Sequence, residues 1–66
     1  MTTATATRRI TALRSEEAAL LAHLRTLAAE CETAEGATYE RLSRQMNRIE
    51  QAALAVSKRI KSAEAA

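Results

Sequence analysis

Apolar residues recur along this chain at alternating intervals of three and four residues, and this spacing constrains the fold more than any other feature. In the first half it runs through Ile10, Leu13, Glu17, Leu20, Leu24, Leu27, Cys31 and Ala34. In the second half it runs through Tyr39, Leu42, Met46, Ile49, Ala53, Val56, Ile60 and Ala63. A repeat that averages 3.5 residues over several heptads is typical of coiled-coil helices. The sequence therefore predicts two long helices, each with one apolar edge, and we call these two sets of residues the seam.

The two repeats are separated at Gly36, the only glycine in a chain that has no proline. Glycine readily adopts the left-handed conformation that closes a helix, and Thr38 is of a type favoured as an N-cap. We therefore expect a helix over about 7–35, a turn at 36–38 and a second helix over about 39–64, with residues 1–6 frayed or disordered. Helices joined by so short a turn must be antiparallel neighbours. The predicted fold is all-α: an antiparallel two-helix coiled-coil hairpin, which forms a single domain over residues 1–66.

In an antiparallel hairpin, facing seam residues have numbers with a constant sum. With the turn centred between residues 36 and 37, the facing pairs are Cys31/Leu42, Leu27/Met46, Leu24/Ile49, Leu20/Ala53, Glu17/Val56, Leu13/Ile60 and Ile10/Ala63. Glu17 is the one charged seam residue, and we expect it to lean toward Lys58 or Arg59, to meet a cation of a partner, or to set the register. The same register places Glu16 beside Arg59 as an exposed ion pair.

Composition excludes several other classes of fold. The chain has no Phe or Trp and one Tyr, whereas an all-β domain needs aromatic or β-branched strands separated by regular turns. One cysteine cannot form a disulfide within its own chain, and one Cys with one His cannot complete a tetrahedral zinc site. Sixteen of the 66 residues are alanine, so large apolar side chains are few and a lone hairpin would be marginally stable. We therefore expect self-association or a partner.

No group of residues has a spacing suited to catalysis. His23 and Cys31 are eight residues apart, about 12 Å along a helix, which is too far for them to share a metal ion or a proton. Glu16 and Glu17 are adjacent and point about 100° apart on a helix. The sequence contains no glycine-rich loop that would hold a phosphate. We expect a non-enzymatic protein with no cofactor, no metal ion and no small-molecule substrate, in which Cys31 is a seam residue.

Two observations bear on the location of the protein. No apolar run approaches the roughly 18 residues that a membrane span needs, so we expect a soluble protein without a membrane partner. A single free cysteine is typical of a reducing compartment, which favours the cytoplasm.

Beside the seam, each predicted helix has further residues suited to packing against another helix pair. Leu21 and Ala28 flank the seam of the first helix, and Ser43, Leu54 and Ser57 lie on the matching side of the second. Small residues next to exposed leucines suit helix docking. We therefore predict a homodimeric four-helix bundle through this side, with the relative direction of the two hairpins left open.

The second half also carries an outward-facing basic face. The net charge is +2, and residues 39–66 hold six Lys and Arg against three Glu. Arg41, Arg44 and Arg48, which we call the arginine stripe, share one helix face, and Lys58 and Lys61 continue the positive character. Arginine binds carboxylates and phosphates in a planar fork. These five residues are the predicted partner-binding set; the alternative is a charged face that contacts only water.

The sequence favours an interaction protein over an enzyme: an adaptor, regulator or inhibitor that dimerises and binds another protein. Its small size is typical of such proteins encoded by plasmids or phages. The second hypothesis is a regulator that binds RNA or DNA, although the many Glu and the single aromatic residue weaken it. The predicted architecture resembles that of Rop, a plasmid copy-number regulator whose helical hairpins dimerise and bind RNA. The resemblance is one of form, because the two share no motif, and it implies no residue roles.

Overall fold

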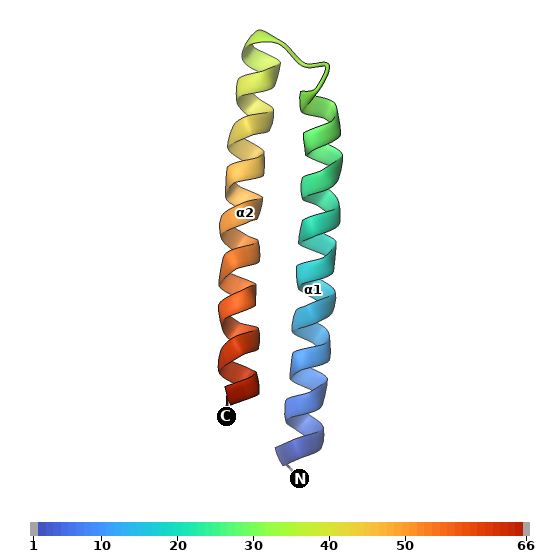
Figure 1. Ribbon diagram of the computed structural model, residues 1–66, viewed down its shortest axis with the longest axis vertical. Helices are drawn as coiled ribbons and strands as arrows, with labels where there is room; N and C mark the ends of the chain where they lie inside the picture. The colour runs from blue at the N-terminus through green and yellow to red at the C-terminus, as the bar shows by residue number, and fades with distance from the viewer. Residues whose placement is uncertain (1, 66) are drawn as a thin grey trace.

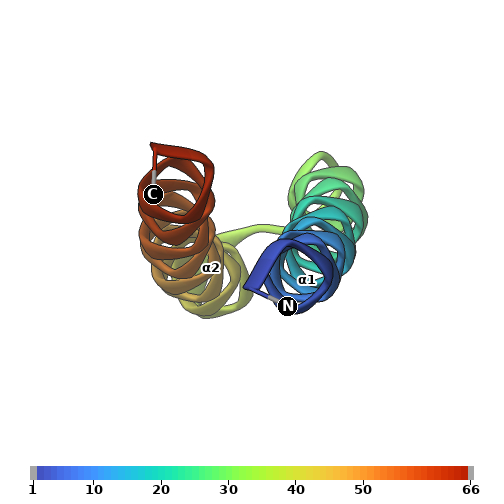
Figure 2. The same cartoon turned by 90° about the horizontal axis from the view of Figure 1, so that it is seen from below.

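The computed structural model describes residues 2–65, which form two helices packed side by side (Figure 1). α1 spans Thr2–Cys31 and α2 spans Gly36–Ala65. The helices run in opposite directions, so both chain ends lie at one end of a hairpin 53 Å long, which we call the open end; the other is the turn end. Seen along its length, the two helices are inclined to one another, as coiled-coil packing requires (Figure 2). The predicted all-α hairpin is confirmed, and Met1 and Ala66 of the predicted domain lie outside the described residues.

α1 begins at Thr2, earlier than the expected start near residue 7. Residues 2–6, for which the sequence predicts fraying or disorder, continue the helix in the structure. Alanines at positions 4 and 6 favour helix, and the Thr7 hydroxyl donates a hydrogen bond to the Thr3 carbonyl at 2.9 Å. All side chains from residue 3 to residue 9 are exposed, so this extension lengthens α1 without adding to the core.

The turn occupies residues 32–35, and the prediction of a turn at 36–38 is wrong. α1 ends at Cys31, where three successive amides donate to carbonyls three residues earlier, each at 3.3 Å: Glu32 to Ala29, Thr33 to Glu30 and Ala34 to Cys31. These bonds satisfy carbonyls that a helix end leaves free, and they do so without a glycine. Ala34 remains half-buried although it lies in the turn. The apolar repeat therefore continues past the end of the helix, which is why it indicated a longer first helix.

Gly36 has the expected left-handed conformation, with φ at +60°, but it opens α2 and does not close α1. Thr38 consequently lies inside α2, and its predicted role as the N-cap is wrong.

We expect Gly36→Ala to lower the free energy of unfolding by about 1–2 kcal/mol, the cost of placing an L-residue in the left-handed region. A Cβ at this position would meet nothing within 4 Å, so the cost is backbone strain and not a clash. Gly36→Asn is the matched control and should cost less, because Asn tolerates this region better. Urea unfolding followed by circular dichroism measures both variants. A Gly36→Ala protein as stable as the wild type would contradict the left-handed conformation at position 36.

The core is a narrow row of side chains between the two helices. Leu27 and Leu42 are 5% exposed, Val56 is 3% exposed and Ile60 is 8% exposed, and these are the buried hydrophobic residues of the described chain. Every seam position except Tyr39 is buried or half-buried, so the predicted seam is confirmed there. Tyr39 is 49% exposed. Cys31, the last residue of α1, contacts Met46, so Tyr39 lies about two helical turns beyond the end of α1, where no helix faces it. Figure 1 shows that α2 starts beyond the level at which α1 ends.

The contacts between the helices agree with antiparallel pairing, but a seam residue can contact a residue one helical turn beyond its expected partner. The Cys31 Sγ lies 3.5 Å from the Met46 Sδ, one helical turn beyond Leu42, its expected partner. The expected ion pair between Glu16 and Arg59 does not form. Across the described residues the one salt bridge joins Arg14 to Glu64, two exposed side chains near the open end.

Candidate interaction surfaces

The arginine stripe lies exposed on α2, near the turn end. Its members are three and four residues apart, which places them on one helix face. Arg41 and Arg44 border a shallow depression of about 300 Å³ together with Ala37 and Thr38. No member of the stripe forms a salt bridge with any residue from 2 to 65, and Glu40 does not pair with Arg44. The stripe therefore presents guanidinium groups to solvent without a counter-ion from the described chain.

The two lysines of the predicted partner-binding set lie apart from the stripe. Lys58 and Lys61 are exposed on α2, but Lys58 is ten residues from Arg48, about 15 Å along the helix. Lys58 borders a groove between the helices, which Lys61 does not line. The structure thus divides the set into a stripe near the turn end and a basic region near the open end.

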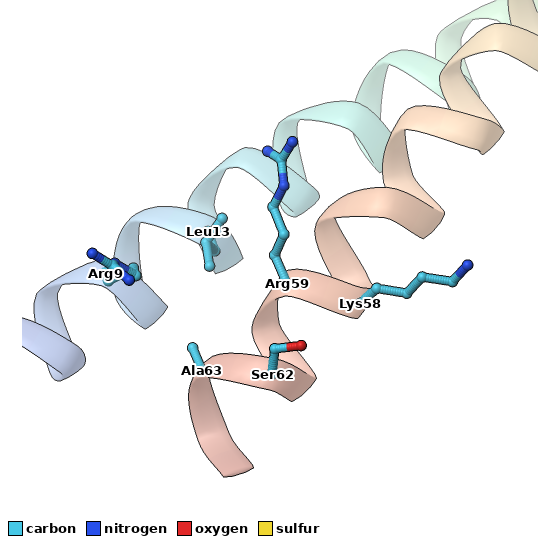
Figure 3. A pocket seen from close by; sticks show the side chains of 6 residues that line it. All are labelled: Arg9, Leu13, Lys58, Arg59, Ser62 and Ala63. Atoms are coloured by element: carbon cyan, nitrogen blue, oxygen red, sulfur yellow. The ribbon is translucent and has the colours of Figure 1, made fainter. Parts of the chain in front are cut away.

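This basic region contains a groove that the sequence analysis missed (Figure 3). The groove measures about 600 Å³ and is lined by Arg9, Leu13, Lys58, Arg59, Ser62 and Ala63. Leu13 and Ala63 lie between the helices, whereas Lys58 points away from α1 and Arg59 extends from α2 toward α1 in this view. A sequence signal was present, because Arg9 and Arg59 each immediately precede a seam isoleucine and so flank the same edge of the hairpin. We call this feature the basic groove.

A second groove, of about 310 Å³, brings together part of the predicted dimer interface. It is lined by Glu17, Leu21, Leu24, Glu50, Ala53, Leu54 and Ser57. Leu21 is 43% exposed and Leu54 is 57% exposed, so this groove presents two large aliphatic side chains to solvent. Two other predicted interface residues, Ala28 and Ser43, are exposed and half-buried respectively and do not line this groove. We call it the leucine groove.

Two glutamates line the leucine groove, on a side for which the sequence predicts only small residues and leucines. Glu17 is half-buried there, and Glu50, which the sequence analysis did not consider, is exposed beside it. Ser57 of this groove and Arg59 of the basic groove are two residues apart, so they point about 200° apart around α2. Glu17 therefore lies on the flank opposite Arg59, and the expected contact of Glu17 with Lys58 or Arg59 does not form.

The remaining polar candidates have ordinary surroundings. Cys31 is half-buried in the seam against Met46, as its position in the repeat predicts, and His23 is exposed on α1. Among residues 2–65, no cluster of three or more His, Cys, Asp or Glu side chains is arranged to hold a metal ion. Neither helix, as far as the structure describes it, has an apolar stretch long enough to cross a bilayer.

These features define a small all-α hairpin with two basic surfaces and one apolar groove. No protein-family model, curated protein or solved structure matches the chain. Its function must therefore be argued from its surfaces.

Proposed function

We propose that this protein is a non-enzymatic interaction module of the cytoplasm, an adaptor, regulator or inhibitor of plasmid or phage origin. In this proposal two copies associate into a four-helix bundle through the side that holds Leu21, Ala28, Ser43, Leu54 and Ser57. The dimer then binds an acidic surface of another protein through Arg41, Arg44, Arg48, Lys58 and Lys61.

The observation that carries the proposal is the apolar surface that one hairpin leaves uncovered. In the described chain, two 30-residue helices hold only four buried hydrophobic side chains, while Leu21 and Leu54 stay exposed in one groove. Burial of apolar area is the main favourable term in folding and association. A second hairpin on this groove would cover both leucines and supply the contacts that one hairpin lacks.

Sedimentation equilibrium of the wild-type protein tests the self-association. We expect a dimer at micromolar concentration, and a stable monomer with full helicity at that concentration would contradict the proposal.

Replacing the arginine stripe by glutamine should abolish binding of the protein partner while the helix content stays unchanged. The reason is that Arg41, Arg44 and Arg48 are exposed and lack counter-ions from residues 2–65, so they contribute binding groups and little to folding. The measurement compares recovery of the same partner from host extract by the wild-type and the triple variant.

The control for that experiment removes positive charge from α1 through Arg8→Gln and Arg25→Gln, both at exposed positions outside the basic groove. Recovery should survive in this control. If the stripe variant recovers the partner as well as the wild type does, the stripe contacts only water.

Binding of RNA or DNA is the second candidate function, and the three cations of the basic groove favour it. Affinity from phosphate contacts falls steeply with salt. A filter-binding titration with a duplex DNA and a stem-loop RNA at two salt concentrations separates the two candidates. Salt-sensitive binding that is weakened by glutamine substitutions in the arginine stripe or in the basic groove would favour the nucleic-acid regulator, and the absence of such binding would exclude it.

A further inference from the structure

The arginine stripe and the basic groove lie on the same flank of α2. Arg41 and Arg48 are seven residues apart, and Arg48 and Arg59 are eleven residues apart, which is close to two and three whole turns of an α-helix. The three side chains therefore start from one line along α2, at intervals of about 10 Å and 16 Å at 1.5 Å per residue. All three are exposed. The line of the stripe thus leads along α2 to the groove that Arg59 lines.

The glutamates of α2 lie off this line. Glu50 lines the leucine groove on the opposite flank, and Glu64 pairs with Arg14. Glu40 precedes Arg41 directly and so points about 100° away from it. Along its described length, this flank of α2 therefore carries arginines and no acidic side chain.

The edge of α1 on the same flank is mixed in charge. Arg9, Glu16, His23 and Glu30 follow one another at intervals of seven residues, and all four are exposed. Only Arg9 of these lines the basic groove, across from Arg59. Neither glutamate forms a salt bridge with any residue from 2 to 65. The excess of positive charge therefore follows α2 and reaches α1 at the basic groove.

The surface between the stripe and the groove carries small side chains. Ala52 and Ala55 are exposed on this flank between Arg48 and Arg59. At the open end the basic groove adds an apolar floor, since Leu13 and Ala63 lie between the helices there (Figure 3). We call this surface, which joins the arginine stripe through Arg59 to the basic groove, the arginine track.

We infer that the arginine track binds an amphipathic helix of the protein partner, one that carries carboxylates beside an apolar edge. This inference rests on the proposed binding of an acidic protein surface, and it names the element that binds and where it lies. A helix lying along α2 repeats its side chains at the same whole-turn intervals, so its carboxylates can pair with Arg41, Arg48 and Arg59. Its apolar edge would cover Leu13 and Ala63, as in other complexes of a helix in a groove.

Other occupants match these features less closely. A nucleic acid would pair phosphates with the arginines but leave the apolar floor uncovered. A membrane surface needs large apolar side chains to insert, and the exposed ones of the described chain lie elsewhere. Leu21 and Leu54 line the leucine groove, and Tyr39 is 20 residues from Arg59, about 200° around α2. A second copy on the leucine groove would leave the track open, because the two lie on opposite flanks.

A synthetic peptide tests the inference by fluorescence anisotropy with the full-length protein. The peptide has about 28 residues, with leucine at the two seam positions of each heptad and glutamate at the two flanking positions, where like charges disfavour pairing of the peptide with itself. We expect it to bind the wild type, and Arg9→Gln with Arg59→Gln to weaken binding about tenfold, the loss of two ion pairs. The matched control, Arg8→Gln with Arg25→Gln, removes two exposed charges outside the groove and should bind as the wild type does.

Two further probes identify the chemistry that is recognised. A peptide with glutamine in place of every leucine keeps the carboxylates and a similar helix propensity, and it should bind at least tenfold more weakly. Equal binding of the two peptides would overturn the role of the apolar floor. A duplex DNA that binds more tightly than the first peptide at the same salt concentration, and loses affinity in the Arg9 and Arg59 variant, would identify a nucleic-acid site and overturn the inference.

The outcome also separates this inference from the proposed function. If the peptide does not bind, or if the Arg9 and Arg59 variant binds it as tightly as the wild type does, the inference is overturned. Recovery of a protein partner from host extract that depends on the arginine stripe would then still support the proposed function. Loss of both results would refute the two together.

Discussion

Replacing Leu27 by alanine is expected to lower the free energy of unfolding by about 2–5 kcal/mol, the range measured for large-to-small substitutions in protein cores. Leu27 is 5% exposed and is one of only four buried hydrophobic side chains in the described chain. Small domains have total stabilities of about 5–15 kcal/mol, so this loss would remove a large part of the stability of a protein at the lower end of that range. Urea unfolding followed by circular dichroism at fixed protein concentration measures the change.

Leu27→Met is the matched control, because it keeps the volume of the side chain and should cost less than about 1.5 kcal/mol. Met and Leu have similar helix propensities, so a difference between the two variants reports packing and not helix formation. A loss below 1 kcal/mol for Leu27→Ala would mean that the seam near the turn end is not closely packed, in conflict with the burial of Leu27 and Leu42.

Replacing both Leu21 and Leu54 by glutamine is expected to convert the proposed dimer into a monomer. Each leucine is about half exposed in one hairpin, so a dimer would bury the rest of four such side chains. Removing about 1 kcal/mol for each weakens the dimer by roughly 4 kcal/mol, about a thousandfold in the dissociation constant. Glutamine and leucine have similar helix propensities, so the hairpin itself should stay helical. Sedimentation equilibrium across a concentration series measures the change in association.

The control for this pair is Ala22→Gln with Ala55→Gln, which adds the same two side chains at exposed positions outside the leucine groove. This control should remain dimeric. A Leu21 and Leu54 variant that still sediments as a dimer would place the interface on another side of the hairpin, where the basic groove is the next candidate.

Most of the candidate surfaces could be assigned from helical spacing, because residues three and four apart share a face whatever the helix packs against. The exposed stripe of Arg41, Arg44 and Arg48 was predictable for this reason, and so was the shared face of Leu54 and Ser57, whereas Leu21 was placed on the same side by the expected antiparallel pairing. The grooves were not predictable in the same way. Arg9 and Arg59 are 50 residues apart in the chain, and only the packing of α1 against α2 brings them to one rim.

The apolar repeat determined which edge of each helix is buried. The short interruption near Gly36 determined that the chain forms two helices and that they are antiparallel, since a turn of a few residues leaves the second helix no other direction. The position of the turn was decided by the backbone hydrogen bonds after Cys31. The repeat does not show where the first helix ends, because Ala34 occupies a half-buried seam position although it lies in the turn. The choice of Arg14 with Glu64 over Glu16 with Arg59 was likewise decided by the tertiary structure. Long side chains can reach several neighbours, and the relative rotation and level of the two helices determine which of them is close enough to pair.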